Sequence, residues 1–518
     1  MIVSFNNLSG SGLIKDVNSE LLSIDPFVWT EAINVRFKDG SIKKINGSEE
    51  IIQTLIPPHY ITCIYPNNEM YFILVFSRTE AQCYYSGSWT NITRPSENYQ
   101  YSNKNWQHTI INTFPIFNNG YDIPQVWKPA LPGTTLENLP AFPKNMYCGI
   151  IRSFKSHLIA GNITDNTYNF PSRILWSGSA LPGELPSTWD ISDITNDAGY
   201  MDLSDTPGEI IDMKLLGDNL VIYKKKAMYL MYYIGGNNIF SIKQIFNNIG
   251  SVSIDCVCDV KGGHLVITED DVIIHDGNSY KSIVDQRLRQ TIFNAIDKIS
   301  FKNCRVIPNY KQNEVWLCIP THDELITSVY IFNYETNVWT TRTVLQTECL
   351  SAMPLDISIA EKINLVPETF NSSSSYVYDI SKYYKYKQYM VLADLYHNRL
   401  LLLDSSSNRE VGVDMISTVE RKNINLSDDE SIKIVKRIYP KMTKLSGTSN
   451  IVNFYIGTQM MRNEPIIWSP AMPFDIVTGY KLDFFATGRY ISIRIESTTD
   501  IEWTIENFEL EITSGGKW

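Results

Sequence analysis

Residues 255–284, DCVCDVKGGHLVITEDDVIIHDGNSYKSIV, carry the pattern that decides the fold of this 518-residue chain. Short apolar runs in this stretch are separated by turn signals at Gly262-Gly263, Asp270-Asp271 and Asp276-Gly277. Short runs of β-branched residues bounded by Gly and Asp predict the strands of an antiparallel meander. Glycine adopts the positive φ that a tight hairpin turn requires, and aromatic residues pair well across neighbouring strands. The stretch therefore predicts one small antiparallel sheet.

The same unit recurs along the chain. Each copy has an apolar run, a short polar turn, a second strand, and an aromatic residue beyond a further turn. The copies occupy residues 69–93, 151–176, 210–234, 303–344 and 387–404, and residues 105–130 are a candidate for another. Four-stranded propeller blades recur at about 40–50 residues and tolerate insertions. The sequence therefore favours an all-β fold, a β-propeller of about six to seven blades, some irregular. The alternative is a series of meanders in stacked β-sandwiches.

The two ends of the chain do not follow this unit. Residues 1–60 contain Asp25-Pro26-Phe27-Val28-Trp29 and an alternating stretch from Ala32 to Ile45. Beyond the serine runs at 372–375 and 405–407, the segments IVNFYI and YISIRIE, at residues 451–456 and 490–496, alternate apolar and polar side chains. Such alternation is typical of a half-buried antiparallel sheet.

The expected domain organisation follows from this division. We expect a β-propeller over residues 61–404 and a β-sandwich-like domain over residues 405–518. Residues 1–60 are expected to form a β segment that is a candidate to pack with the C-terminal domain. The one clear helical pattern, from Val284 to Ile299, predicts a single helix or two short turns on a sheet edge.

Composition limits the functional classes. The chain has 45 basic and 56 acidic residues, for a net charge of -11, while 43% of its residues are hydrophobic and 12% aromatic. Binding to the phosphate backbone by counterion release needs a basic face, so a sequence-specific DNA reader is not expected. A protein that nucleic acid slides past without adhering remains compatible with this charge.

The eight cysteines predict buried free thiols. They are scattered, and most lie in apolar runs such as Trp316-Leu317-Cys318-Ile319. Cys256 and Cys258 share one strand face, but no second pair lies at zinc-ribbon spacing, so we predict no metal site. Reduced thiols, an N-terminus without a signal pattern and the absence of a long apolar run indicate synthesis in a cytoplasm and no membrane span.

Motifs for catalysis are missing from the sequence. It contains no G-x-S-x-G elbow, P-loop or dinucleotide fingerprint, and no two histidines are spaced as paired metal ligands. His157 and His264 lie in apolar strands and are expected to be structural. The carboxylates at residues 269–271, 323–324 and 428–430 are expected to lie in solvated turns. We therefore predict no catalytic, cofactor-binding or metal-binding residues and no enzymatic activity.

A glycan-binding or carbohydrate-active propeller is the alternative functional class. Sialidase-type repeats carry a Ser-x-Asp-x-Gly-x-x-Trp turn, and the nearest segments here, residues 275–280 and 334–339, do not match it. A basic run at Lys224, Lys225 and Lys226 lies at a predicted hairpin tip. Such a run is usually a solvated turn, and it is the one candidate for contact with nucleic acid or with an acidic partner surface.

An ordered series of short segments runs from the middle of the chain to its end. The series comprises Ile174-Leu175-Trp176-Ser177-Gly178, Trp189-Asp190, Asp205-Thr206-Pro207-Gly208-Glu209-Ile210, Leu216-Gly217-Asp218, Gly262-Gly263-His264, Asn313-Glu314-Val315-Trp316, Trp339, Gly488-Arg489-Tyr490 and Trp503. Taken together, these segments resemble the tail nozzle proteins of short-tailed (podovirus) phages, also described as tail tubular protein B-like or packaged-DNA stabilisation proteins. The resemblance covers most of residues 170–345 and 435–518, and much less of the remainder.

This resemblance implies a structural protein of the virion tail, synthesised in the host bacterial cytoplasm. Members of the family form a ring, typically a homohexamer, below the portal and its adaptor, the head-to-tail connector protein. The ring extends and closes the DNA channel, retains the packaged double-stranded DNA, lets it pass on ejection, and docks tail fibres or a tail tip or needle. The resemblance implies no cofactor.

Overall fold

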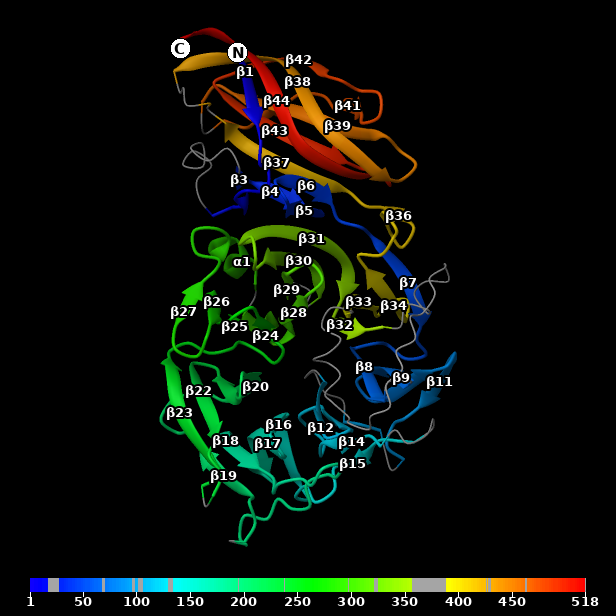
Figure 1. The fold of residues 1–518 in the computed structure, drawn as a ribbon, viewed down its shortest axis with the longest axis vertical. Helices are drawn as coiled ribbons and strands as arrows, with labels where there is room; N and C mark the ends of the chain where they lie inside the picture. The colour runs from blue at the N-terminus through cyan, green and yellow to red at the C-terminus, as the bar shows by residue number, and fades with distance from the viewer. Residues whose placement is uncertain are drawn as a thin grey trace.

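The computed structural model describes residues 1–16, 28–67, 70–95, 98–100, 106–128, 134–193, 195–236, 238–296, 298–320, 325–355, 388–424, 426, 430–461 and 464–517. Within these residues the fold is an all-β propeller joined to a second β domain (Figure 1). The propeller forms the lower ring in the view of Figure 1, and the second domain lies above it with both chain ends. The expected fold class is confirmed.

The first four blades are consecutive antiparallel meanders. Blade 1 contains β8 (Tyr60–Asn67), β9 (Met70–Phe76), β10 (Ala81–Tyr85) and β11 (Ser88–Asn91). Blade 2 contains β12 (Gln107–Ile111), β13 (Phe114–Asn118), β14 (Gln125–Val126) and β15 (Glu137–Asn138). Blade 3 contains β16 (Met146–Phe154), β17 (His157–Asp165), β18 (Tyr168–Trp176) and β19 (Gly199–Asp202). Blade 4 contains β20 (Ile210–Leu216), β21 (Asn219–Lys224), β22 (Ala227–Tyr233) and β23 (Phe240–Asn247).

Three further blades complete the ring in the described part of the chain. Blade 5 contains β24 (Val257–Val260), β25 (Gly263–Ile267), β26 (Val272–His275) and β27 (Tyr280–Ser282). Blade 6 contains β28 (Arg305–Asn309), β29 (Glu314–Cys318), β30 (Ile326–Asn333) and β31 (Val338–Thr347). Blade 7 contains β32 (Leu350–Pro354), β33 (Gln388–Asp394), β34 (Arg399–Leu403) and β7 (Ser48–Gln53). The candidate unit at residues 105–130 is blade 2.

Blade 7 is closed by a strand from the other end of the chain. β7 pairs antiparallel with β34, with Ser48 opposite Leu403 and Ile52 opposite Leu400. Residues 48–53 therefore complete the propeller, although they fall inside the expected N-terminal segment 1–60. Joining the first and last parts of a propeller in one sheet covers strand edges that would otherwise be open to pairing with another chain.

The second domain is a β-sandwich built from both ends of the chain. One sheet has the order β42-β38-β44-β6-β5, with β1 (Ile2–Phe5) beside β44. Its strands are β5 (Val35–Lys38), β6 (Ser41–Lys44), β38 (Ser431–Ser446), β42 (Leu482–Gly488) and β44 (Glu502–Lys517). β1, β5 and β6 thus place parts of the expected N-terminal segment in one sheet with strands of the expected C-terminal domain.

The other sheet of the sandwich is continuous with blade 6. It extends from β31 through β4 (Glu31–Ile33), β37 (Ser417–Ile424), β43 (Tyr490–Ser497) and β39 (Ile451–Gln459) to β40 (Ile467–Trp468), and β41 (Met472–Asp475) also pairs with β39. Alternate residues of β39, among them Val452, Phe454 and Ile456, are buried between the two sheets. The shared sheet holds the sandwich against one side of the propeller.

The remaining elements are short. Gly12–Leu13 (β2) pairs with Val28–Trp29 (β3), and Arg409–Glu410 (β35) pairs with Val413–Asp414 (β36). The helix α1 spans Arg289–Ala295, and a 3₁₀ helix spans Lys298–Asn303. The prediction of one helix or two short turns near these residues is confirmed. In the part of the chain that the structure describes, no helix has the length and apolar character to cross a membrane.

Candidate functional site

The centre of the propeller is a channel with a volume of about 940 Å³. The first strand of every blade lines it, from β8 in blade 1 to β32 in blade 7. These inner strands run in the same direction because each blade repeats the same meander. Residues close to the start of six of these strands meet at one end of the channel, together with Arg152 from the last part of β16.

Polar side chains gather at that end, one from each blade or from the residues leading into it. They are Tyr60, His108, Arg152, Asp212, Asp255, Arg305 and Cys349, and we call this set the polar ring. All of them except Cys349 line the channel, and Cys349 lies directly behind Arg305. The ring contains two guanidinium groups and two carboxyl groups, so its formal charges balance when His108 is neutral.

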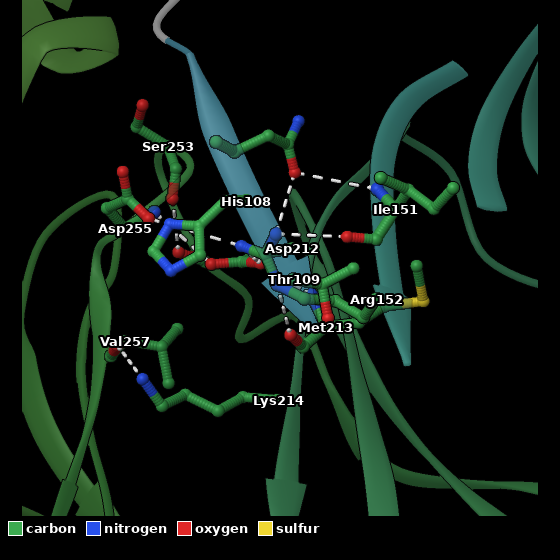
Figure 2. Close-up of polar contacts among 12 residues, drawn as sticks. His108, Thr109, Ile151, Arg152, Asp212, Met213, Lys214, Ser253, Asp255 and Val257 are labelled. Atoms are coloured by element: carbon green, nitrogen blue, oxygen red, sulfur yellow. Dashed lines mark hydrogen bonds and ion pairs between the residues drawn. The ribbon is translucent and has the colours of Figure 1, made fainter. Parts of the chain in front are cut away.

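Arg152 and Asp212 form the best-connected pair of the polar ring (Figure 2). Arg152 Nη2 lies 2.8 Å from Asp212 Oδ1, Nη1 donates to Gln107 Oε1 at 2.8 Å, and Nε donates to the Met213 carbonyl at 3.2 Å. Asp212 also accepts from the backbone N–H groups of Met213 and Asp255. Burial raises the pKa of Asp212, and the charge of Arg152 opposes that rise.

Arg305 is much less well paired. Its side chain is only 4% exposed, yet its nearest polar contacts are Cys349 Sγ at 3.6 Å and Asp255 Oδ2 at 3.8 Å, both from Nη1. Nε and Nη2 are buried and make no hydrogen bond in the described structure. Burial acts to lower the pKa of Arg305, but Cys349, Asp255 and Tyr60 act in the other direction and the net shift is upward. Arg305 therefore stays protonated.

Tyr60 and His108 complete the polar ring. The Tyr60 hydroxyl lies 2.5 Å from His108 Nδ1, which joins blade 1 to blade 2. Burial raises the pKa of Tyr60 well above its usual range, and the charge of Asp255 adds to this effect. Tyr60 is therefore a neutral hydrogen-bonding group at any physiological pH.

Blades 4 and 5 share a second buried polar group. The Tyr223 hydroxyl lies 2.6 Å from His264 Nδ1 and 2.8 Å from His275 Nε2. His264 Nε2 lies 2.7 Å from the Leu215 carbonyl and must donate to it, so His264 Nδ1 accepts from Tyr223. Tyr223 then accepts from His275 Nε2, and His275 Nδ1 is left without a partner. The prediction that His157 and His264 are structural is confirmed by their burial and hydrogen bonds.

Three carboxyl groups line the channel, and each has a basic group beside it. Asp212 is occupied by Arg152 and by two backbone donors, and Asp255 lies between Arg152 and Arg305. Asp259 Oδ1 lies 3.2 Å from His264 Nε2. Over the described residues, no group of three or more His, Cys, Asp or Glu side chains is placed to hold a metal ion. A channel of this volume has the size of a small-molecule pocket. A DNA duplex is too wide to pass through it.

The structure separates the three lysines that were the predicted contact residues. Lys224 is completely buried, and its Nζ donates to the carbonyls of Leu203 at 2.7 Å and Thr206 at 2.5 Å and to Ser172 Oγ at 3.1 Å. The expectation that Lys224 contacts a partner is therefore wrong, because its ammonium group is enclosed between blade strands. Lys225 and Lys226 are exposed at the hairpin between β21 and β22, and contact through them stays a prediction.

Of the carboxylates that were expected in solvated turns, those at residues 269–271 lie in the described part of the chain, between β25 and β26. Asp270 is exposed between β25 and β26, Glu269 lies 3.7 Å from Lys226, and Asp271 lies 2.6 Å from Arg289. Asp323, Glu324, Asp428 and Asp429 lie outside the described residues, as do Asp25, Pro26, Phe27 and the serines at 372–375. The cysteines are free, and seven of the eight are buried.

Sequence reasoning missed the polar ring. The available signal was a charged residue beside or within a short apolar run, as in CGIIRSF around Arg152, EIIDMKLL around Asp212 and NCRVIP around Arg305. Taken alone, each of these residues is an ordinary charged residue near the end of a strand. Only the closure of the ring brings them together across more than one hundred residues.

Comparisons with known proteins show similarity in fold alone. No family model matches the chain, and no curated protein matches it. Solved structures that resemble it include PorZ, a surface component of the type-IX secretion system of Porphyromonas gingivalis, at 11% identity and a TM-score of 0.30, covering 58% of this chain and 35% of PorZ. The Neurospora crassa Pan2 WD40 domain is 9% identical with a TM-score of 0.36, covering 70% of this chain and 95% of that domain. The WD40 β-propeller domain of Doa1 is 9% identical with a TM-score of 0.36, covering 69% and 96% respectively.

Proposed function

We propose that this chain is a structural subunit of the tail of a short-tailed phage. In this proposal several copies, six by the resemblance, form a ring that extends the DNA channel below the portal adaptor. The ring retains packaged DNA, lets it pass on ejection, and provides a surface for tail fibres or a tail tip. The ordered series of segments that resembles tail nozzle proteins carries the proposal.

The positions of those segments support it. Trp176, Trp316 and Trp339 lie on β18, β29 and β31, where they pack within blades 3 and 6. Gly488-Arg489-Tyr490 lies at the junction of β42 and β43, and Trp503 is buried in the sandwich. The shared segments thus form the framework of both domains, as expected if the whole architecture is shared.

Exposed apolar side chains at opposite ends of the molecule also support a ring. On the sandwich, Val477, Tyr480 and Phe485 are 64%, 77% and 87% exposed. On blade 3, Tyr168 and Tyr200 are exposed, and β19 lies at the end of the molecule away from β42 (Figure 1). A cyclic ring with more than two members requires two different patches per subunit, one for each neighbour. Large apolar side chains left in water are typical of protein interaction sites.

The charge of the chain fits a conduit formed between subunits. The propeller channel of one subunit is narrowed by the polar ring, so in this proposal DNA passes through the centre of the assembly. A net charge of -11 repels the phosphate backbone over a distance of about one Debye length, roughly 8 Å at physiological ionic strength. DNA is then expected to slide without adhering.

A glycan-binding propeller is the second candidate, and the channel volume of about 940 Å³ is the observation that favours it. Against a glycosidase, Asp212 already accepts hydrogen bonds from Arg152 and from two backbone N–H groups. Binding on a glycan array that is lost when the channel residues Lys214 and Tyr310 are replaced would favour this candidate. Silence on the array would remove it.

An amber mutation in the gene tests the proposed function. Phage grown without suppression should make filled heads that lose their DNA, because the ring that closes the channel is missing. Particles that keep their DNA and remain infectious without the chain would contradict the proposal. A plasmid copy of the unaltered gene that restores infectivity is the control.

A further inference from the structure

Phe485 projects from a bulge at the edge of the sandwich. β42 is the last strand of its sheet, and its pairing with β38 places Phe484 and Phe485 opposite the single residue Lys436. A bulge of this kind bends the strand and re-aims the side chains that it carries. Phe484 packs into the sandwich core, whereas Phe485 is 87% exposed. The bulge thus presents one phenyl ring to solvent, and a large apolar side chain in this position is typical of a protein contact.

An apolar pocket on blade 3 has the size to receive such a ring. Its volume is about 380 Å³, and its lining includes Pro143, Met146, Leu175, Trp189 and Ile191. Pockets for small organic ligands have volumes of roughly 300–1,000 Å³, so a single phenyl ring fits. The Trp189 ring is held edge-to-face against Phe142, with ring centroids 5.0 Å apart, and Ile191 is 48% exposed. The pocket is therefore preformed, with an apolar wall that is open to solvent.

The rim of this pocket is acidic, and the strand beside Phe485 is basic. Residues 181–209, of which 187–191 line the pocket, contain no Lys or Arg. They contain seven acidic residues, all exposed: Glu184, Asp190, Asp193, Asp197, Asp202, Asp205 and Glu209. β38, the neighbour of β42, contains four Lys, one Arg and no acidic residue, and the acidic residues of the sheet lie mainly on β44, one strand further from Phe485. The two surfaces therefore attract each other, most strongly at low ionic strength.

We propose that Phe485 of one copy of this chain inserts into the blade 3 pocket of a second copy. β18 and β19 of blade 3 lie at the end of the molecule away from β42, so the chain does not fill its own pocket (Figure 1). Each copy then offers one phenyl ring and one pocket, and head-to-tail contacts of this kind generate closed rings or open filaments. The contact rests on the proposed function for the closure of the ring, and it names the two surfaces that join neighbours in it.

Disulfide trapping of the full-length protein tests the contact. A chain that carries both F485C and I191C should form covalent trimers and larger species on oxidation with diamide, because every copy has one thiol of each kind. Chains with F485C mixed with chains with I191C should form covalent dimers only. Each single variant alone should stay monomeric, since seven of the eight native cysteines are buried. Denaturing gel electrophoresis without a reducing agent measures the products.

A tryptophan in the pocket tests insertion of the ring itself. Ser187 is exposed and lines the pocket. S187W, added to the chain with both cysteines, should lower the cross-linked fraction at least about tenfold, because the indole occupies the space that the partner would enter. S204W is the matched control: Ser204 is an exposed serine of the same acidic segment outside the pocket lining, and its replacement should leave the cross-linked fraction unchanged.

Three results would overturn the proposal. They are no cross-link in the chain with both cysteines, covalent dimers of F485C alone, and a cross-linked fraction that S187W leaves unchanged. A failure of the proposed function gives a different pattern. A ring in phage tails whose neighbours do not cross-link would remove this contact alone. Cross-linking by a chain that is absent from phage tails would remove the tail function and leave the contact.

Discussion

Leu403 is the register partner of Ser48, so the outer strand of the last blade comes from the first part of the chain. The pairing places β7 over Leu400 and Leu402 of β34, which are 0% and 9% exposed. The propeller is thereby closed by hydrogen bonds between residues more than three hundred positions apart. Closure also ties the ring to the sandwich, because β5 and β6, which directly precede β7 in the chain, belong to that domain.

The first prediction concerns this closing strand. Replacing SEEIIQ at residues 48–53 by a Gly-Ser segment of equal length should destabilise the chain by roughly 3 kcal/mol or more, because two or more buried apolar side chains become exposed to water. Urea unfolding measures the loss, and hydrogen exchange should show that β33 and β34 open first. The same replacement at Val413-Asp414, an exposed two-residue strand, should change stability little. Equal effects of the two replacements would contradict closure by β7.

Lys224 provides the second prediction. K224M should lower the free energy of unfolding by about 3 kcal/mol, because it leaves two buried carbonyl oxygens and the half-buried Ser172 hydroxyl without their shared donor. K225M, at the exposed neighbouring position, should lie within about 0.5 kcal/mol of the unaltered protein. Urea unfolding of both variants measures these two changes in the free energy of unfolding. Similar stabilities would mean that Lys224 lies at the surface.

These lysines show where sequence reasoning succeeds and where it stops. The hairpin at 224–226 was predictable because two apolar runs flank a polar tip, and the same reasoning located six blades and gave residues 105–130 as a candidate for the seventh. The side of the strand on which Lys224 lies was not predictable, because the acceptors Leu203 and Thr206 come from a connection about 20 residues earlier. Lysine is usually exposed, so the local pattern indicated a solvated turn.

The partner of the N-terminal strand β7 and the contacts of the polar ring could not be predicted from the sequence, for a related reason. Ile51 and Ile52 follow two glutamates in SEEIIQ, and nothing in that short run specifies β34 as its partner. Asp212 and Arg305 lie near the start of a strand and Arg152 near the end of one, but their contacts depend on closing a ring of seven blades. Alternation within one strand is a local property and was therefore read correctly for β39 and β43.

The third prediction is a pH dependence of stability. Burial, with a smaller effect from His264, lowers the pKa of His275 from 6.5 to about 4 in the folded chain. Between these pH values the unfolded chain binds a proton at His275 and the folded chain does not, so acidification favours unfolding. The contribution of neutral His275 is complete above pH 6.5 and is lost as the pH falls toward 4.

Urea unfolding at pH 7.0 and pH 4.5 measures this effect. The unaltered protein should lose on the order of 2–3 kcal/mol more than H275Q over this interval, because glutamine does not titrate and still offers a donor to Tyr223. H397Q replaces an exposed histidine and serves as the control. Parallel pH profiles for the unaltered protein and H275Q would show that His275 is not held neutral by the fold.

The fourth prediction addresses assembly. F485S removes the most exposed aromatic side chain of the sandwich, and it should leave the stability of the monomer within about 0.5 kcal/mol of the unaltered chain. The ring should nevertheless be weakened, by about 2 kcal/mol per contact if Phe485 is a central interface residue. Mass photometry of the assembled protein measures the loss of high-mass species. T487S, on the same exposed side of β42, is the matched control. Full assembly by F485S would place the subunit contacts elsewhere.

A high-resolution electron microscopy map of the purified phage tail tests the proposed ring. The map should show a closed ring of this chain below the portal adaptor, with a DNA channel between subunits and with the narrow channel of each propeller away from the DNA. A map in which the chain is absent, or in which it occurs as single copies that enclose no channel, would rule out the proposed ring.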